Sequence, residues 1–168
     1  ASDFTGALDG QQMVRYTSNH DVNGSDGTPL DLFGGEKGSM AAFAVVAYMK
    51  GIPMIYNGQE VGTPYRLTFP FTSTKINWEL NPEMTAEYKR IVTFRNQSEA
   101  IRRGQLISYS SDDVCAFIKQ QGDEKVFVIV NLRNQIIEYS FISELVNTSW
   151  SDVFNGGSVK LSEKISLQ

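Results

Sequence analysis

Tyr16-Thr17-Ser18-Asn19-His20-Asp21 decides how we interpret the chain, because this short apolar-to-polar run ends in an imidazole beside a carboxylate. Residues 13–16 predict a buried strand, and the Gly-, Asn- and Asp-rich residues 22–27 predict its exit turn. His20 and Asp21 therefore lie where a strand ends, which in an α/β barrel is the face on which chemistry is assembled. A lone His beside a lone Asp is more often a loop pair that satisfies local hydrogen bonds, so a functional interpretation needs a second signal.

That second signal is Gly51-Ile52-Pro53-Met54-Ile55-Tyr56-Asn57-Gly58-Gln59-Glu60-Val61-Gly62. Residues 52–56 form a short strand that is apolar on both faces, which suits a parallel barrel strand, and it again ends in polar groups. Between the two strands, residues 36–50 predict a helix with a wide apolar face, and Gly51 is a suitable stop for it. The order strand, helix, strand predicts two parallel strands whose ends reach the same face.

The two motifs together resemble the α-amylase family of glycoside hydrolases, whose catalytic domain is a (β/α) TIM barrel. The family's seventh strand ends in an aromatic residue, a few small residues and Asn-His-Asp, as residues 16–21 do here. Its eighth strand carries Gly-x-Pro-x-Ile-Tyr-x-Gly-x-Glu-x-Gly, which residues 51–62 match at every fixed position. Two ordered motifs separated by one helix are a specific signal.

The resemblance implies roles for five residues. Asp21 corresponds to the family's third acid, which grips the hydroxyls beside the reacting carbon and stabilises the partly positive sugar ring of the transition state. His20 and Asn19 are implied to bind the substrate. Tyr56 and Glu60 are implied to be structural residues beside the site, and Glu60 is not expected to act as a catalytic acid.

The resemblance also implies that the nucleophile and the general acid lie outside this chain. Retaining glycosidases need two such carboxyl groups, about 5 to 5.5 Å apart, and in the family they come from the fourth and fifth barrel strands. Residues 16–21 and 51–62 already account for the seventh and eighth strands. We therefore expect the isolated chain to have no significant hydrolytic activity.

The fold class implied is α/β followed by all-β. A complete barrel needs about 250 residues, and this chain has 168 residues. Residues 1–104 are expected to form the carboxyl-terminal part of a TIM barrel, a remnant with strands seven and eight. Residues 105–168 are expected to form a C-terminal antiparallel β-sandwich, and the family's final strand usually follows a segment like residues 159–167, so that strand is expected beyond the chain.

Two barrel strands cannot bury both of their faces without the other six. We therefore expect Val14, Ile52, Met54 and Ile55 to be partly uncovered. The partner implied for them is the remainder of the barrel, although self-association would serve the same end.

Several further elements follow from local patterns. Residues 1–12 predict a linker or the tail of a preceding helix, and residues 22–35 and 57–80 predict long loops. The second loop carries scattered residues that either rim a sugar site or anchor the loop, namely Tyr65, Arg66, Phe69, Phe71 and Trp78. Helices are predicted from Asn81 to Gln97 and over residues 98–104, and short strands over residues 106–109, 114–119, 126–132, 136–141, 150–154, 159–161 and 165–167.

Composition disfavours several classes of partner. The formal charge is −4 with 20% charged residues, and Lys and Arg do not cluster, so no nucleic acid is expected. No apolar run approaches the roughly 18 residues of a membrane span, and the single Cys115 excludes an internal disulfide. No acids have the spacing of a calcium loop, so no metal or other cofactor is predicted here, although calcium is common in the complete enzymes. The compartment stays open, with secretion or the cell envelope slightly favoured.

The leading hypothesis is part of an α-amylase-like retaining hydrolase of α-glucans such as starch and maltooligosaccharides. The alternative is a non-catalytic carbohydrate-binding or structural module. Sequence upstream of Ala1 would separate them, since only the enzyme requires a strand followed by Arg-x-Asp and, later, a strand that ends in Glu.

Overall fold

The computed structural model describes residue 8, residues 10–72 and residues 74–168 of the chain. The linker predicted for residues 1–12 therefore lies largely outside the described residues. The helices are α1 (His20–Ser25), α2 (Pro29–Leu32), α3 (Glu36–Tyr48), the short 3-10 helix η2 (Gln59–Val61), α4 (Pro82–Gln97) and α5 (Glu99–Arg103). The strands are β1 (Val14–Tyr16), β2 (Ile52–Met54), β3 (Gln105–Ser108), β4 (Val114–Gln121), β5 (Glu124–Asn131), β6 (Ile137–Ser140), β7 (Ser149–Ser151), β8 (Ser158–Lys160) and β9 (Lys164–Leu167).

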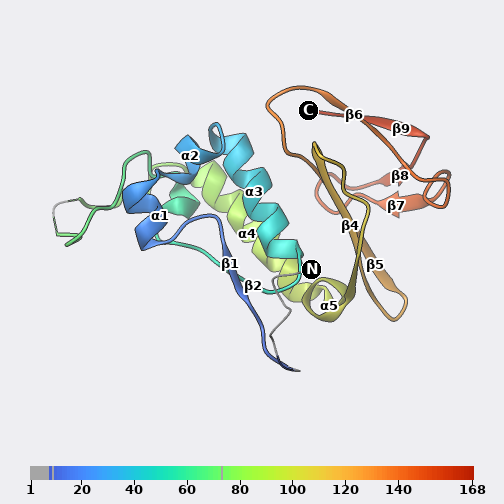
Figure 1. The fold of residues 1–168 in the computed structure, drawn as a ribbon, viewed down its shortest axis with the longest axis horizontal. Coiled ribbons are helices and arrows are strands. Elements are labelled where there is room, and N and C mark those ends of the chain that lie inside the picture. Colours follow the sequence, from blue (N-terminus) through green and yellow to red (C-terminus); the bar gives the residue numbers. More distant parts are fainter. Residues whose placement is uncertain (1–7, 9, 73) are drawn as a thin grey trace.

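The chain divides in space into a helical part and a β part, with the antiparallel sheet β3-β4-β5 at their junction (Figure 1). Successive residues of β4 explain this arrangement, because side chains alternate between the two faces of a sheet. Phe117 packs with the helices, whereas Ala116 and Ile118 pack with the remaining strands. Both faces of this sheet are covered, which accounts for the nearly continuous apolar run that we predicted as a strand.

The outer β layer consists of two antiparallel pairs, β6 with β9 and β7 with β8. Tyr139 of β6 is 6% exposed and packs edge-to-face against Phe141, with their ring centroids 5.2 Å apart. The Tyr139 hydroxyl donates a hydrogen bond to the carbonyl of Tyr109, which follows β3. The antiparallel, β-rich carboxyl-terminal part predicted from the turn spacing is therefore present, as two β layers packed face to face.

The helical part is built on the contact of α3 with α4, which run parallel to each other, since Asn81 bonds Glu36 at their starts and Arg95 bonds Ala47 near their ends (Figure 1). Phe43 of α3 lies against Tyr88 of α4 with ring centroids 4.3 Å apart, and Tyr48 lies against Phe94 at 5.8 Å. The predicted helices over residues 36–50, 81–97 and 98–104 are confirmed within one or two residues at each end. Asn81 caps α4 as predicted, since its side-chain oxygen accepts a hydrogen bond from the Met84 amide.

Arg95 joins the end of α3 to the start of β2. Its guanidinium donates to the carbonyl of Ala47 at 2.6 Å and to the carbonyl of Gly51 at 2.7 Å, and the residue is only 9% exposed. Burial, with a smaller effect of Arg102, lowers the pKa of Arg95. The carbonyl groups at the end of a helix carry partial negative charge, so this cation is well placed although buried.

The structure corrects the loop predicted for residues 22–35, which was wrong. Helices α1 and α2 occupy most of it. Thr28, Pro29 and Asp31 supply the reason, because the Thr28 hydroxyl accepts from the Asp31 amide while the Asp31 carboxylate accepts from the Thr28 amide, with Pro29 at the first helical position. This capping box is a helix-start signal that the Gly- and Asp-rich composition obscured.

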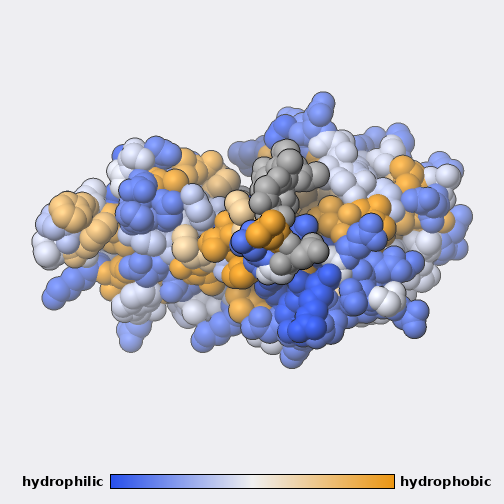
Figure 2. All heavy atoms as spheres, turned by 60° about the horizontal axis from the view of Figure 1, so that its bottom comes forward, coloured by the Kyte–Doolittle hydropathy of each residue, from blue (hydrophilic) through white to orange (hydrophobic). Residues whose placement is uncertain are grey.

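Strands β1 and β2 form a parallel pair, with Val14 opposite Ile52 and Tyr16 opposite Met54. The burial predicted for β1 is not realised within this chain, since Val14 and Tyr16 are 53% and 44% exposed. The expectation that apolar side chains of these two strands stay partly uncovered is confirmed, because Ile52 is also 49% exposed and Ile55, directly after β2, is 38% exposed. Apolar side chains lie open on the face seen in Figure 2, to which these strands turn.

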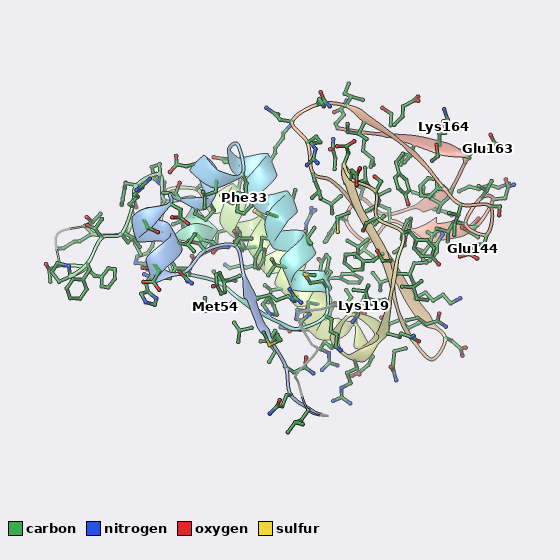
Figure 3. The ribbon with its side chains drawn as sticks, in the orientation of Figure 1. Phe33, Met54, Lys119, Glu144, Glu163 and Lys164 are labelled. Atoms are coloured by element: carbon green, nitrogen blue, oxygen red, sulfur yellow. The ribbon has the colours of Figure 1, made fainter. Side chains whose placement is uncertain are left out.

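Lys119 is an unusual residue of the central sheet, because it lies on the helix-facing side of β4 near α5 (Figure 3) and is only 2% exposed. Loss of hydration, together with the charges of Arg95 and Lys50, lowers the pKa of Lys119 to about 8 from its ordinary 10.5. The buried ammonium group therefore opposes folding at neutral pH.

We expect Lys119→Met to raise the free energy of unfolding at pH 7 by about 1–3 kcal/mol. The unfolded chain binds more protons than the folded chain between pH 8 and 10.5, so the stability of the unmodified protein rises with pH in that window and the variant loses this rise. Urea unfolding at several pH values measures both effects. The control is Lys125→Met, at an exposed lysine of β5, which should change stability by less than about 0.5 kcal/mol. A Lys119→Met variant less stable than the unmodified protein at pH 7 would contradict the prediction.

Candidate functional site

The ends of β1 and β2 lie side by side, because the two strands are parallel and Tyr16 is opposite Met54. The segments that follow them, which carry all five predicted site residues, therefore leave from the same edge. Directly after β1, Thr17 and Ser18 are 7% and 0% exposed, so the chain turns into the protein before it reaches the polar residues.

Asn19 fixes how those polar residues are presented. It is the cap of α1, and its side-chain oxygen accepts hydrogen bonds from the amides of Asp21 at 2.9 Å and Val22 at 2.8 Å. This bond pattern holds His20 and Asp21 in the first turn of the helix. The structure thus gives the Asn19 oxygen a structural task beside the substrate-binding role that the sequence suggested.

His20 and Asp21 form an exposed pair at the start of α1. The His20 Nε2 atom lies 3.4 Å from Asp21 Oδ1, and the two side chains are 66% and 80% exposed. A carboxylate in the first turn of a helix is stabilised by the positive end of the helix dipole. The arrangement therefore offers a ligand one anionic acceptor and one imidazole, both open to it.

A pocket of about 610 Å³ opens beside His20, and Asp21 is not among the residues that line it. Its volume is within the range of about 300–1,000 Å³ that is usual for small-molecule sites. His20 lines it, and so does Tyr56 from the segment after β2, so the pocket brings together residues from both motifs. The other lining residues are Asn57, Leu67, Phe71, Thr74, Lys75, Ile76 and Trp78.

Gln59 holds the two motifs together from below this edge, and sequence reasoning missed it. Its side-chain amide donates to the Thr17 hydroxyl at 2.8 Å and to the Tyr88 hydroxyl at 2.9 Å, while its carbonyl accepts from the Tyr56 amide at 3.3 Å. Gln59 is 4% exposed and Tyr88 is 2% exposed. Burial raises the pKa of Tyr88 to about 12, so the phenol stays neutral.

The glycines of the second motif explain how Gln59 reaches this position. Gly58 and Gly62 flank η2 with φ angles of 88° and 64°, in the left-handed region that favours glycine. A Cβ atom at Gly58 would also lie 2.7 Å from the Thr63 hydroxyl. The two glycines therefore allow the tight turn that places Gln59 in the interior. In the sequence, the glycines on either side of residues 59–61 were the signal that could have pointed to Gln59.

Tyr56 and Glu60 occupy different surroundings. Tyr56 is half-buried in the pocket wall, where burial raises the pKa of its hydroxyl. Glu60 is absent from that wall. Its backbone carbonyl accepts a hydrogen bond from the Thr85 hydroxyl of α4 at 3.1 Å, and its Oε2 atom is buried with no hydrogen-bond partner among the described residues. The structure does not bring Glu60 together with His20 on the pocket wall.

The described residues provide neither a metal-binding cluster nor a membrane-spanning helix. No group of three or more His, Cys, Asp and Glu side chains in that part of the chain comes together in a way that could hold a metal ion. Within the same residues, no helix combines the length and apolarity that crossing a bilayer requires.

Known proteins resemble this chain in sequence and in fold. It is 25% identical over 160 residues to α-amylase 2 of Dictyoglomus thermophilum, covering 86% of this chain and 26% of that protein. It is 30% identical over 94 residues to a cyclomaltodextrinase of Geobacillus thermopakistaniensis, covering 52% of this chain and 16% of that protein. A crystal structure of the α-amylase from Geobacillus thermoleovorans, complexed with acarbose, superposes with a TM-score of 0.72 at 17% identity, over 93% of this chain and 36% of that one. No family model matches.

The parallel strand pair and the two strand-end motifs agree with the similarity of this chain to α-amylase 2 and to the cyclomaltodextrinase. In sequence and in fold the chain is similar to members of the α-amylase family. It spans about a quarter or less of the length of these two curated relatives, which are 26% and 16% covered.

We expect Gln59→Met to lower the free energy of unfolding by about 2–4 kcal/mol. Methionine has a similar length but no amide, so the hydroxyls of Thr17 and Tyr88 and the amide of Tyr56 lose their shared partner. Urea unfolding measures the loss. The matched control is Gln97→Met at the exposed last residue of α4, which should change stability by less than about 0.5 kcal/mol. Equal losses in the two variants would refute the role given to Gln59.

Proposed function

We propose that this chain supplies the substrate-holding part of a retaining glycoside hydrolase that acts on α-glucans such as starch and maltooligosaccharides. The observation that carries the proposal is the shared pocket, in which His20 from the first motif and Tyr56 from the second line one wall. The similarity to α-amylase 2 and to the cyclomaltodextrinase supports the reaction class. The acarbose complex of the Geobacillus thermoleovorans α-amylase supports a sugar-like ligand.

In this proposal Asp21 stabilises the transition state. The sugar ring carries partial positive charge as its glycosidic bond breaks, and a fixed carboxylate interacts more strongly with that ring than with the neutral substrate. His20 donates a hydrogen bond to the hydroxyls beside the reacting carbon, and Asn19 contributes to binding while its oxygen holds the turn. Neither Asp21 nor His20 breaks the bond.

The nucleophile and the general acid come, in the proposal, from strands outside residues 1–168. Residues 1–104 then form the carboxyl-terminal part of the barrel with its strands seven and eight, and residues 105–168 form the following β-sandwich domain. The parallel pairing of β1 with β2 supports this division, and so does their uncovered apolar surface. The proposal assigns no metal ligand to this chain.

The remaining barrel strands are the partner that this proposal requires. Val14 and Ile52 are about half exposed, at 53% and 49%, although both are β-branched strand residues. Neighbouring strands on either side would remove this surface from water, at about 25 cal/mol per Å² of apolar area. The proposal includes no nucleic-acid partner.

We expect Asp21→Asn to lower kcat on maltooligosaccharides by about 10³-fold in the polypeptide that joins these residues to the other barrel strands. The amide keeps the shape of the side chain and removes its charge, so the loss reports on electrostatic stabilisation rather than on folding. The control is Asp123→Asn, in the exposed turn between β4 and β5, which should leave kcat unchanged. Full activity of Asp21→Asn would refute the proposed role.

The 168-residue chain alone should release no reducing sugar from starch or maltohexaose, because it lacks both reacting carboxylates. The same preparation is checked for its fold by circular dichroism. Steady turnover by the isolated chain, abolished by a substitution within it, would mean that the catalytic acids lie among these residues and would overturn the assignment.

A further inference from the structure

The loop between η2 and α4 projects from the end of the helical part (Figure 1, green) and carries five residues for which sequence left two roles open. Some of them could rim a sugar site, and others could anchor the loop. The structure separates the two groups by their contacts.

Arg66 is an anchor. Its guanidinium donates to the carbonyls of Ser25 at 2.8 Å and Asp26 at 3.0 Å, where α1 ends. The next residue, Leu67, is 5% exposed, and its amide donates to the Asn23 side chain at 2.7 Å. The loop is therefore fastened to α1, the helix whose first turn carries His20 and Asp21.

Tyr65 is a second anchor, because its hydroxyl donates to the Lys75 carbonyl at 2.7 Å and so ties the start of the loop to its return. Phe69 is different again, with 85% of its surface exposed and no place in the pocket wall. Its ring meets Phe71 edge-to-face with centroids 5.8 Å apart.

Phe71 and Trp78 are the aromatic residues of this loop that line the pocket with His20. They are 47% and 57% exposed, and neither belongs to a hydrophobic core cluster. Aromatic side chains this exposed are not held there by core packing. Their position beside a polar pair is what a ligand with one apolar face and several hydroxyls requires.

We propose that Phe71 and Trp78 form an aromatic wall that packs against the C–H face of a glucosyl unit in the pocket beside His20. The inference rests on the proposed function and adds to it the residues that recognise the ring. A neutral, polyhydroxylated ring with an apolar face is the ligand that the aromatic wall and the His20 imidazole suit together.

The test is equilibrium binding of maltohexaose to the 168-residue protein by isothermal titration calorimetry. Hydrolysis is not expected in this protein, so the sugar stays intact during the titration. Trp78→Ala should weaken binding about 5- to 20-fold and Phe71→Ala about 3- to 10-fold, while Trp78→Phe, which keeps an aromatic face, should stay within about 3-fold of the unmodified protein. The control is Phe33→Ala, at an exposed aromatic residue that does not line the pocket, which should change binding by less than about 2-fold. Circular dichroism confirms that each variant is folded.

The outcomes separate the inference from the proposed function. If His20→Ala weakens binding while Trp78→Ala and Phe71→Ala do not, the aromatic wall is wrong and the proposed function stands. If both wall variants weaken binding while His20→Ala does not, the wall stands and the substrate-binding role given to His20 falls. If the folded, unmodified protein binds no maltohexaose, or Trp78→Phe loses as much affinity as Trp78→Ala, the inference is overturned.

Discussion

The buried amide of Gln59 is the interaction on which the arrangement of the candidate site depends. An amide in a nearly dry interior must satisfy its donors and its acceptor, because each one left unpaired costs free energy. Gln59 meets this requirement with Thr17 after β1, Tyr56 after β2 and Tyr88 of α4. The three partners come from three segments. The hydrogen bonds of one side chain therefore link the end of β1 to the end of β2 and link both to α4.

That helix is in turn supported by the β part of the chain. Phe117 of β4 and Val128 of β5 belong to the same core cluster as Phe43, Tyr48 and Tyr88, so the central sheet forms a wall for α3 and α4. The other face of the sheet is covered by the outer strands. The outer β layer, the central sheet and the helices therefore pack in succession behind the strand ends.

Much of the fold could be predicted from sequence, because periodicity and capping residues are local signals. The helices α3, α4 and α5 and the strands β3 to β9 were predicted within a few residues. The loop assigned to residues 22–35 was wrong, since its Gly and Asp content outweighed the capping box at Thr28 and Asp31. The burial predicted for Val14 and Tyr16 was wrong because burial depends on which neighbouring strands pack against β1, and the residues of β1 itself do not specify those strands.

The candidate site was predictable only as far as its motifs extend. His20, Asp21 and Tyr56 were found because their spacing matches a family pattern, and the structure places His20 and Tyr56 on one pocket. The roles of these residues and the division at residue 104 stay predictions. Gln59 and the wall residues Phe71 and Trp78 could not be assigned, because a variable position and scattered aromatics acquire meaning only when the chain is folded. Asn19 shows the converse, since its main visible task is a backbone cap that the motif did not distinguish from ligand binding.

The reach of Arg95 also sets a limit on length variation among related chains. One guanidinium bridges the Ala47 and Gly51 carbonyls, so the three-residue connection between α3 and β2, residues 49–51, has a fixed span. An inserted or deleted residue there would withdraw one carbonyl and leave a buried cation half-solvated. Homologous chains should therefore keep the length of the α3 to β2 connection constant.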